Sequence, residues 1–207
     1  MAALETESDA RRGCAEHWRA GLPLLATPRV TLREIRLSDA APLYGLARRP
    51  DVARFIWPAP TELDAFHRFI EWTWAERAAG KYIGFVIVPN GATQPAGLFE
   101  LRQMQPSFFR AELGFFIDPA HWGTGLFTEA AQLVLDFAFR VVGIHRIEAR
   151  ATVDNTRSNR ALRKLGAQQE GILRASFVCD GALVDQALWA FVRGVDTVPR
   201  RQSGDVR

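Results

Sequence analysis

The stretch HWGTGLFTEA, residues 121–130, lies between a segment that alternates like a strand and a long apolar segment typical of a helix. It holds two glycines, Gly123 and Gly125, separated by a single threonine. Glycine inside a regular element costs roughly 0.5–1 kcal/mol relative to alanine, so the pair indicates a backbone conformation that other residues resist. The turn also leads into a helix amino terminus, where unpaired N–H groups and the helix dipole attract anions such as phosphate.

The glycine turn matches neither of two well-known phosphate-binding loops. No Gly-Lys-Ser/Thr follows it, which excludes a Walker loop. The third glycine of the dinucleotide fingerprint is absent, and three antiparallel-type strands precede the turn where a βαβ unit is required. On this segment alone, two interpretations stay open. One is an anion site with Thr124 or Thr128 as an additional hydroxyl donor, and the other is a tight helix entry without a ligand.

The elements around the turn predict a mixed α+β domain. Period-two alternation and helical spacing give the order β-α-α-β-β-β-α-β-α-β-β, without internal repeats. The expected strands are residues 29–37, 81–89, 97–104, 111–119, 145–153, 170–178 and 183–191, and the expected helices are 38–48, 60–80, 128–142 and 155–166. Gly80, Gly143 and Gly166 are expected to end helices.

A chain of 207 residues with 48% hydrophobic and 24% charged residues fits one globular domain. We expect a flexible arm over residues 1–22, the domain over 23–193 and a flexible tail over 194–207. The amino terminus shows no signal-peptide apolar core, and no apolar stretch approaches the ~20 residues of a membrane span, so a cytoplasmic location without membrane association is expected. Cys14 and Cys179 offer no disulfide framework and no metal-ligand spacing, so no metal is expected.

The basic balance of the chain does not by itself favour nucleic-acid binding. The isoelectric point is about 9.3 and the net charge is +3. Residues 193–207 hold four arginines and two aspartates, which account for +2 of that charge. The body of the chain therefore lacks the basic stripe of a phosphate-tracking surface, and no nucleic-acid partner is expected.

Two segments together resemble a known family. AELGFFIDPAHWGTGLFTEA (residues 111–130) and NTRSNRALRKLGAQQEG (residues 155–171) resemble the two motifs of the GCN5-related N-acetyltransferase (GNAT) superfamily, in particular its RimJ/RimL-like ribosomal-protein branch. The resemblance covers roughly residues 28–192. It implies a mostly antiparallel central sheet with splayed fourth and fifth strands and helices on both faces. It also implies acetyl-CoA as cosubstrate and no metal.

The resemblance assigns a coenzyme site residue by residue. It implies that the turn from Trp122 to Phe127 cradles the pyrophosphate with backbone amides and that the pantetheine arm lies beside a bulged fourth strand. Asn155 matches an asparagine that contacts the arm, and Ser158 a serine near the thioester sulfur. Phe127 departs from the small residue usual in the family, which requires its ring to turn into the helix–sheet interface. The implied coenzyme-binding residues are Phe115, Phe116, Ile117, Trp122, Gly123, Thr124, Gly125, Leu126, Phe127, Thr128, Asn155 and Ser158.

Candidate catalytic residues follow from the chemistry of thioester aminolysis. Many members of the superfamily place a tyrosine acid where this chain has Leu162, so Ser158 is the remaining donor to the departing thiolate. The attacking amine must be neutral, so a base or a water relay has to remove its proton. Glu112 is the first candidate base, with Glu100 and Asp185 behind it as acceptor-side carboxylates. Trp57 is a candidate wall of the acceptor pocket.

The sequence thus predicts an acetyl-CoA-dependent N-acetyltransferase that acts on a primary amine by direct transfer in a ternary complex. The acceptor, a protein amino terminus or a small molecule, is left open, because specificity lies in variable loops and not in the fold. A non-catalytic acyl-CoA-binding sensor is the alternative, which the missing tyrosine supports. The expected partners are acetyl-CoA and the amine, with the chain a monomer or a homodimer.

Overall fold

The computed structural model describes residues 17–56, 62–179 and 181–194, so most of the expected arm and tail lies outside the described residues. The last part of the expected arm is packed. Trp18 is only 4% exposed, and its ring meets that of Phe108 edge-on, with centroids 5.6 Å apart. Because this large ring joins the core, the packed domain begins before residue 23.

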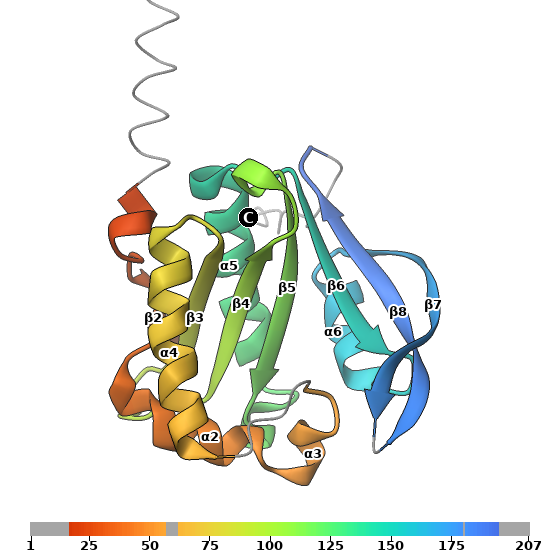
Figure 1. The fold of residues 1–207 in the computed structure, drawn as a ribbon, viewed down its shortest axis with the longest axis horizontal. Coiled ribbons are helices and arrows are strands. Elements are labelled where there is room, and N and C mark those ends of the chain that lie inside the picture. The colour runs from red at the N-terminus through yellow and green to blue at the C-terminus, as the bar shows by residue number, and fades with distance from the viewer. Residues whose placement is uncertain (1–16, 57–61, 180, 195–207) are drawn as a thin grey trace, which may run out of the picture.

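The centre of the molecule is an eight-stranded sheet in the order β1-β2-β3-β4-β5-β6-β8-β7. Every neighbouring pair is antiparallel except β5 and β6, which are parallel (Figure 1). The strands are β1 (Leu25–Ala26), β2 (Val30–Glu34), β3 (Tyr82–Pro89), β4 (Gly97–Gln103), β5 (Arg110–Ile117), β6 (Arg146–Thr152), β7 (Gln168–Cys179) and β8 (Ala182–Val192). The expected α+β class with a mostly antiparallel sheet is confirmed.

Helices cover both faces of this sheet. In Figure 1, α4 and α2 lie in front of the early strands, α5 and α6 lie behind the sheet, and α3 lies near the end where β5 and β6 diverge. The helices are α2 (Ala40–Ala47), α3 (Pro50–Ala53), α4 (Leu63–Ala78), α5 (Leu126–Phe137) and α6 (Thr156–Lys164). Residues 60 and 61, the start of the helix expected over residues 60–80, lie outside the described residues.

Strand β3 contributes buried apolar side chains to both faces of the sheet. Its apolar run sends Phe85 to the α5 side, where the ring meets Phe137 edge-on at 5.3 Å between centroids. The next residue, Val86, packs on the opposite side with Ile70 of α4. A strand that is buried on both faces has a continuous apolar sequence, because its side chains pack against helices on both sides of the sheet. The core therefore lies in two layers, with the sheet between them.

The helix after the glycine turn begins two residues earlier than predicted, at Leu126, and ends differently. A regular helix is expected over residues 128–142, but α5 ends at Phe137 and a single π-helical turn continues it to Val142. Gly143, with φ 84°, ends this turn in the left-handed conformation, as expected for a glycine stop.

Candidate functional site

The connection from β5 to α5 contains the two glycines of the opening motif. Both adopt left-handed backbone conformations, with φ 76° at Gly123 and φ 86° at Gly125, and Gly125 is the N-cap residue of α5. A Cβ at Gly123 would meet open space, and one at Gly125 would come no closer than 3.6 Å to Arg29 Nη1. The glycines are therefore needed for their φ angles, and the space beside them is left free.

Thr124, between the glycines, uses its hydroxyl inside the turn. The hydroxyl donates to the His121 carbonyl at 2.9 Å and accepts from the Leu126 N–H at 3.3 Å. Neither Thr124 nor Leu126 lines the cavity described below, and the Leu126 side chain is buried in the core. The predicted hydroxyl donation from Thr124 to an anion therefore competes with its bond to His121, and Thr128 is the threonine that faces the cavity.

Arg29, the residue before β2, contacts this turn from outside the motif. Its Nη2 donates to the Thr124 carbonyl at 3.0 Å, and its Nη1 lies 3.5 Å from Glu129 Oε2 in the first turn of α5. Arg29 fixes the orientation of the peptide that leads into Gly125. The sequence gives no signal for this contact, because the two partners are 95 residues apart.

Strands β5 and β6 pair over only a few residues. Their parallel pairing runs from Arg110↔Arg146 to Glu112↔Glu148 and then stops, and the strands diverge toward α3 (Figure 1). The bulge expected in β5 is absent, because its register with β4 is unbroken from Gly97↔Ile117 to Gln103↔Ala111. The splay therefore comes from the end of the β5–β6 pairing, which leaves backbone groups of β5 without partners in β6.

A cavity of about 1080 Å³ opens at this splay. It extends from the glycine turn, past the diverging strands, to the space beneath α3 and α4. Most of the predicted coenzyme-binding residues line it, namely Phe115, Phe116, Ile117, Trp122, Gly123, Gly125, Phe127, Thr128, Asn155 and Ser158. The structure thus gathers residues from β5, the turn, α5 and α6 around one space.

The ring of Phe127 lies in the helix–sheet interface. Its centroid lies 5.3 Å from that of Phe99 and 4.8 Å from that of Phe115, both in tilted arrangements. The ring therefore packs over the sheet, as its size requires, and still borders the cavity.

The amino terminus of α6 forms the opposite wall. Asn155 is its N-cap residue, and its Oδ1 accepts from the Ser158 N–H at 3.1 Å. Sequence reasoning missed Asn159, whose Nδ2 donates to the Thr152 carbonyl at 2.8 Å while its Oδ1 accepts from Trp189 Nε1 at 2.8 Å. Asn159 thus ties α6 to β6 and β8, which fixes the wall that presents Ser158 to the cavity.

Basic side chains of α6 border the cavity beside the glycine turn. Arg157, Arg160 and Lys164 line it. The Arg157 guanidinium lies over the Trp122 ring, with its Cζ 3.4 Å from the centroid. This cation–π contact joins α6 to the glycine turn across the splay. Positively charged side chains therefore lie along the cavity next to the glycine turn, which is predicted to bind the pyrophosphate.

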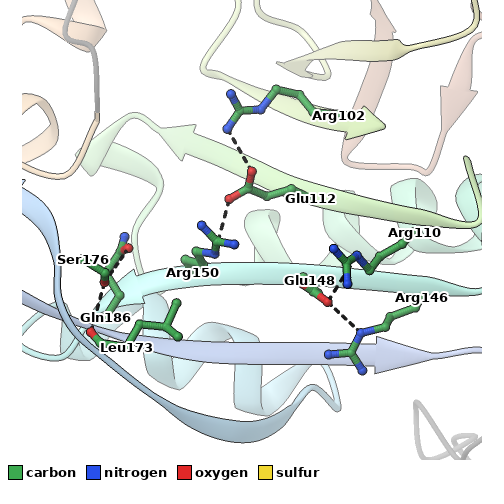
Figure 2. Close-up of polar contacts among 9 residues, drawn as sticks. All are labelled: Arg102, Arg110, Glu112, Arg146, Glu148, Arg150, Leu173, Ser176 and Gln186. Atoms are coloured by element: carbon green, nitrogen blue, oxygen red, sulfur yellow. Dashed lines mark hydrogen bonds and ion pairs between the residues drawn. The ribbon is translucent and has the colours of Figure 1, made fainter. Parts of the chain in front are cut away.

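Glu112, the first candidate base, has two cationic partners. Figure 2 shows its carboxylate between Arg102 of β4 and Arg150 of β6. Arg102 Nη2 lies 3.1 Å from Oε2, and Arg150 Nε lies 3.8 Å from Oε1. Each oxygen of Glu112 therefore faces a guanidinium, which lies where an amine donor would have to approach.

Glu100 lies in the same cavity in a different environment. Its Oε2 accepts from the Tyr82 hydroxyl at 2.6 Å. Burial raises the pKa of Tyr82 well above its ordinary value, and the charge of Glu100 and their hydrogen bond raise that pKa further, so the phenol stays a neutral donor. Gly114 lies opposite Glu100 on β5, and a Cβ there would be 2.5 Å from Glu100 Oε1. The glycine leaves the space that the carboxylate occupies.

The two other acceptor-side candidates do not join this group. Asp185 Oδ1 accepts from the Ala175 N–H at 2.8 Å, at an irregularity of the β7–β8 hairpin, and Asp185 does not line the cavity. Trp57 lies outside the described residues. Within the described ranges, no cluster of three or more His, Cys, Asp or Glu residues could hold a metal ion, and no helix is long and apolar enough to span a bilayer.

Comparisons with known proteins agree with this geometry. The family described as "Acetyltransferase (GNAT) domain" matches residues 29–168. The chain is 30% identical to "Uncharacterized N-acetyltransferase YoaA" of Bacillus subtilis (strain 168), over 83% of this chain and 97% of that protein. It is 29% identical to spermidine N(1)-acetyltransferase of Escherichia coli (strain K12), over 73% and 80%.

A solved structure of Mycobacterium smegmatis RimJ in complex with CoA-disulfide superposes with a TM-score of 0.71 and 26% identity, over 79% of this chain and 82% of that chain. The family match spans more than half of the sequence and runs from before β2, through the glycine turn, to the first residue of β7. The chain therefore belongs to the GNAT acetyltransferase family and is an N-acetyltransferase.

Proposed function

We propose that this protein transfers the acetyl group of acetyl-CoA directly to a primary amine, with both substrates bound in the splayed cavity. The observation that carries the proposal is the continuity of the cavity, which runs from the glycine turn at Gly123 and Gly125 to the carboxylate of Glu100. A single space of this shape allows the thioester and the amine to meet without a covalent enzyme intermediate.

The coenzyme end of the cavity supports binding by backbone groups. The first N–H groups of α5 have no intrahelical partners, and the open glycine turn allows a pyrophosphate to approach them. The pantetheine arm would lie along Phe115 to Ile117, where β5 has lost its pairing with β6, and beside Asn155.

The proposed chemistry is aminolysis of a thioester. The amine nitrogen attacks the carbonyl carbon, the C–S bond breaks, and the thiolate of coenzyme A leaves. We assign Ser158 as the hydroxyl donor to that thiolate. We assign Glu100 as the acceptor of the amine proton, because Glu112 already faces Arg102 and Arg150.

Initial-rate kinetics test the ternary complex. Release of coenzyme A is followed with a thiol reagent while acetyl-CoA and an amine are varied together. Double-reciprocal lines that intersect support direct transfer. Parallel lines indicate an acetylated enzyme intermediate and contradict it.

Binding is tested separately by the melting temperature. Acetyl-CoA at ~100-fold excess over its dissociation constant should stabilise the fold by about 2.7 kcal/mol. Free coenzyme A should stabilise it nearly as well, because the pyrophosphate and pantetheine make most of the proposed contacts. An unchanged melting temperature with both would contradict the proposed site.

A further inference from the structure

The acceptor half of the cavity, beneath α3 and α4, has a mainly apolar wall. Val52, Phe55, Ile56, Phe69, Trp72 and Leu98 line it. The rings of Phe69 and Trp72 are stacked with centroids 6.0 Å apart, and Trp72 meets Tyr82 at 5.1 Å. Trp72 is 45% exposed although it belongs to this cluster. The exposed part of its ring is apolar surface that an acceptor could cover.

Carboxylates in this cavity differ in how their charge is compensated. Asp51 accepts from Arg49 Nε and Nη2, both at 3.2 Å, and Glu112 faces two arginines. Glu100 also lines the cavity, but it accepts its hydrogen bond from the neutral hydroxyl of Tyr82. Within the described ranges, Glu100 is thus the one cavity carboxylate without a cation within 4.0 Å.

The number of carboxylates without a cationic partner limits how many ammonium groups an acceptor can place in the acceptor half of the cavity. One ammonium can pair with Glu100, and the neighbouring aromatic faces favour a cation further. A polyamine carries several ammonium groups, and each additional one would lose its hydration beside arginines and aromatic rings. A single amine on an apolar body matches both the one uncompensated carboxylate and the aromatic wall.

From this juxtaposition we propose that the acceptor is a monoamine with an apolar body of aromatic size. Its ammonium binds at Glu100, and its body packs against Phe69 and Trp72. The inference rests on the proposed function, and it names the class of amine that the site takes. An acceptor of this class would distinguish this protein from an acetyltransferase that acts on polyamines.

The test compares three acceptors at saturating acetyl-CoA, with thiol release as the readout. They are 2-phenylethylamine, spermidine and a tetrapeptide with a free α-amine. We expect kcat/KM for 2-phenylethylamine to exceed that of each of the other two at least tenfold. Equal or better turnover of spermidine or of the peptide overturns the inference but leaves acetyl transfer intact. If none of the three is acetylated, the inference is overturned, and the proposed function fails as well if coenzyme A also does not stabilise the fold.

A pair of variants tests the aromatic wall. Trp72→Ala should raise KM for 2-phenylethylamine at least tenfold, with little change in kcat or in the affinity for coenzyme A. Phe109→Ala is the matched control, because Phe109 is also exposed, at 55%, and stacks on His145 outside the cavity. An unchanged KM in Trp72→Ala, or an equal rise in Phe109→Ala, overturns the inference.

Discussion

Replacement of Gly114 by alanine tests whether the position of Glu100 matters for catalysis. A Cβ on Gly114 would lie 2.5 Å from Glu100 Oε1 and 2.7 Å from Glu100 Cγ. To restore an ordinary contact of 3.4 Å, the carboxylate has to retreat by about 0.9 Å. This movement also strains the 2.6 Å hydrogen bond from Tyr82, so Glu100 loses the partner that holds it.

A misplacement of ~1 Å at a reacting group can cost about 10²-fold in rate. We therefore expect Gly114→Ala to lower kcat/KM by about 10²-fold, which corresponds to about 2.7 kcal/mol of lost transition-state stabilisation. The measurement is thiol release with the best available amine, with coenzyme A affinity determined separately by calorimetry. That affinity should stay within ~3-fold of wild type, because Gly114 precedes the residues assigned to the pantetheine arm.

Two further variants control this result. Gly171→Ala places a methyl group in β7 with no other heavy atom within 4 Å, so its activity should equal that of wild type. Gly114→Ala combined with Glu100→Ala removes the clash, so it should recover thermal stability without recovering activity. Wild-type turnover in Gly114→Ala would refute the role of Glu100, and a parallel loss of coenzyme affinity would reassign Gly114 to the coenzyme site.

Four other predictions concern the turn and the transfer chemistry. Ser158→Ala should leave acetyl-CoA affinity nearly intact and lower kcat by ~10²-fold, and a large loss of affinity would make Ser158 a binding residue instead. Glu100→Gln should lower kcat/KM more than Glu112→Gln, with the loss smaller at high pH where the amine is already neutral; the reverse order would make Glu112 the base. Gly125→Asn should fold better than Gly125→Val, because asparagine tolerates a positive φ, yet both should bind coenzyme A weakly; normal binding by calorimetry would reduce the glycine to a turn former. Arg29→Ala should weaken coenzyme A binding by less than ~10-fold without changing kcat, and an unchanged dissociation constant would show that the turn keeps its shape without Arg29.

Local features of this protein could be predicted from its sequence because their causes are local. A positive φ at Gly123 and Gly125 is a property of the turn itself, and glycine is the residue that adopts it without strain. The apolar runs over β3 to β5 predicted these strands, and the predicted order of elements indicated the α+β class that the structure has. The motif resemblance singled out Asn155 and Ser158, which the structure places together at the start of α6 on one wall of the cavity.

The start of the packed domain and the roles of several polar residues could not be predicted in this way. The arm prediction missed Trp18 because its partner, Phe108, comes from a turn 90 positions later. Asp185 looked like an acceptor-side carboxylate, but its hydrogen bond to the Ala175 N–H arises only at the irregular β7–β8 pairing. Such contacts depend on register, and register is set by the whole sheet.

The sequence alone therefore predicted the family, the strand–turn–helix unit and most of the residues that line the cavity beside the glycine turn. The tertiary structure decided which partners each carboxylate of the cavity has. Antiparallel pairing places Arg102 opposite Glu112, and the short parallel pairing with β6 brings Arg150 to the same carboxylate. Glu100 instead accepts a hydrogen bond from Tyr82 of β3 and occupies the space that Gly114 leaves on β5. The charge around a carboxylate is the sum of neighbours from several strands, and no periodicity along one strand encodes it.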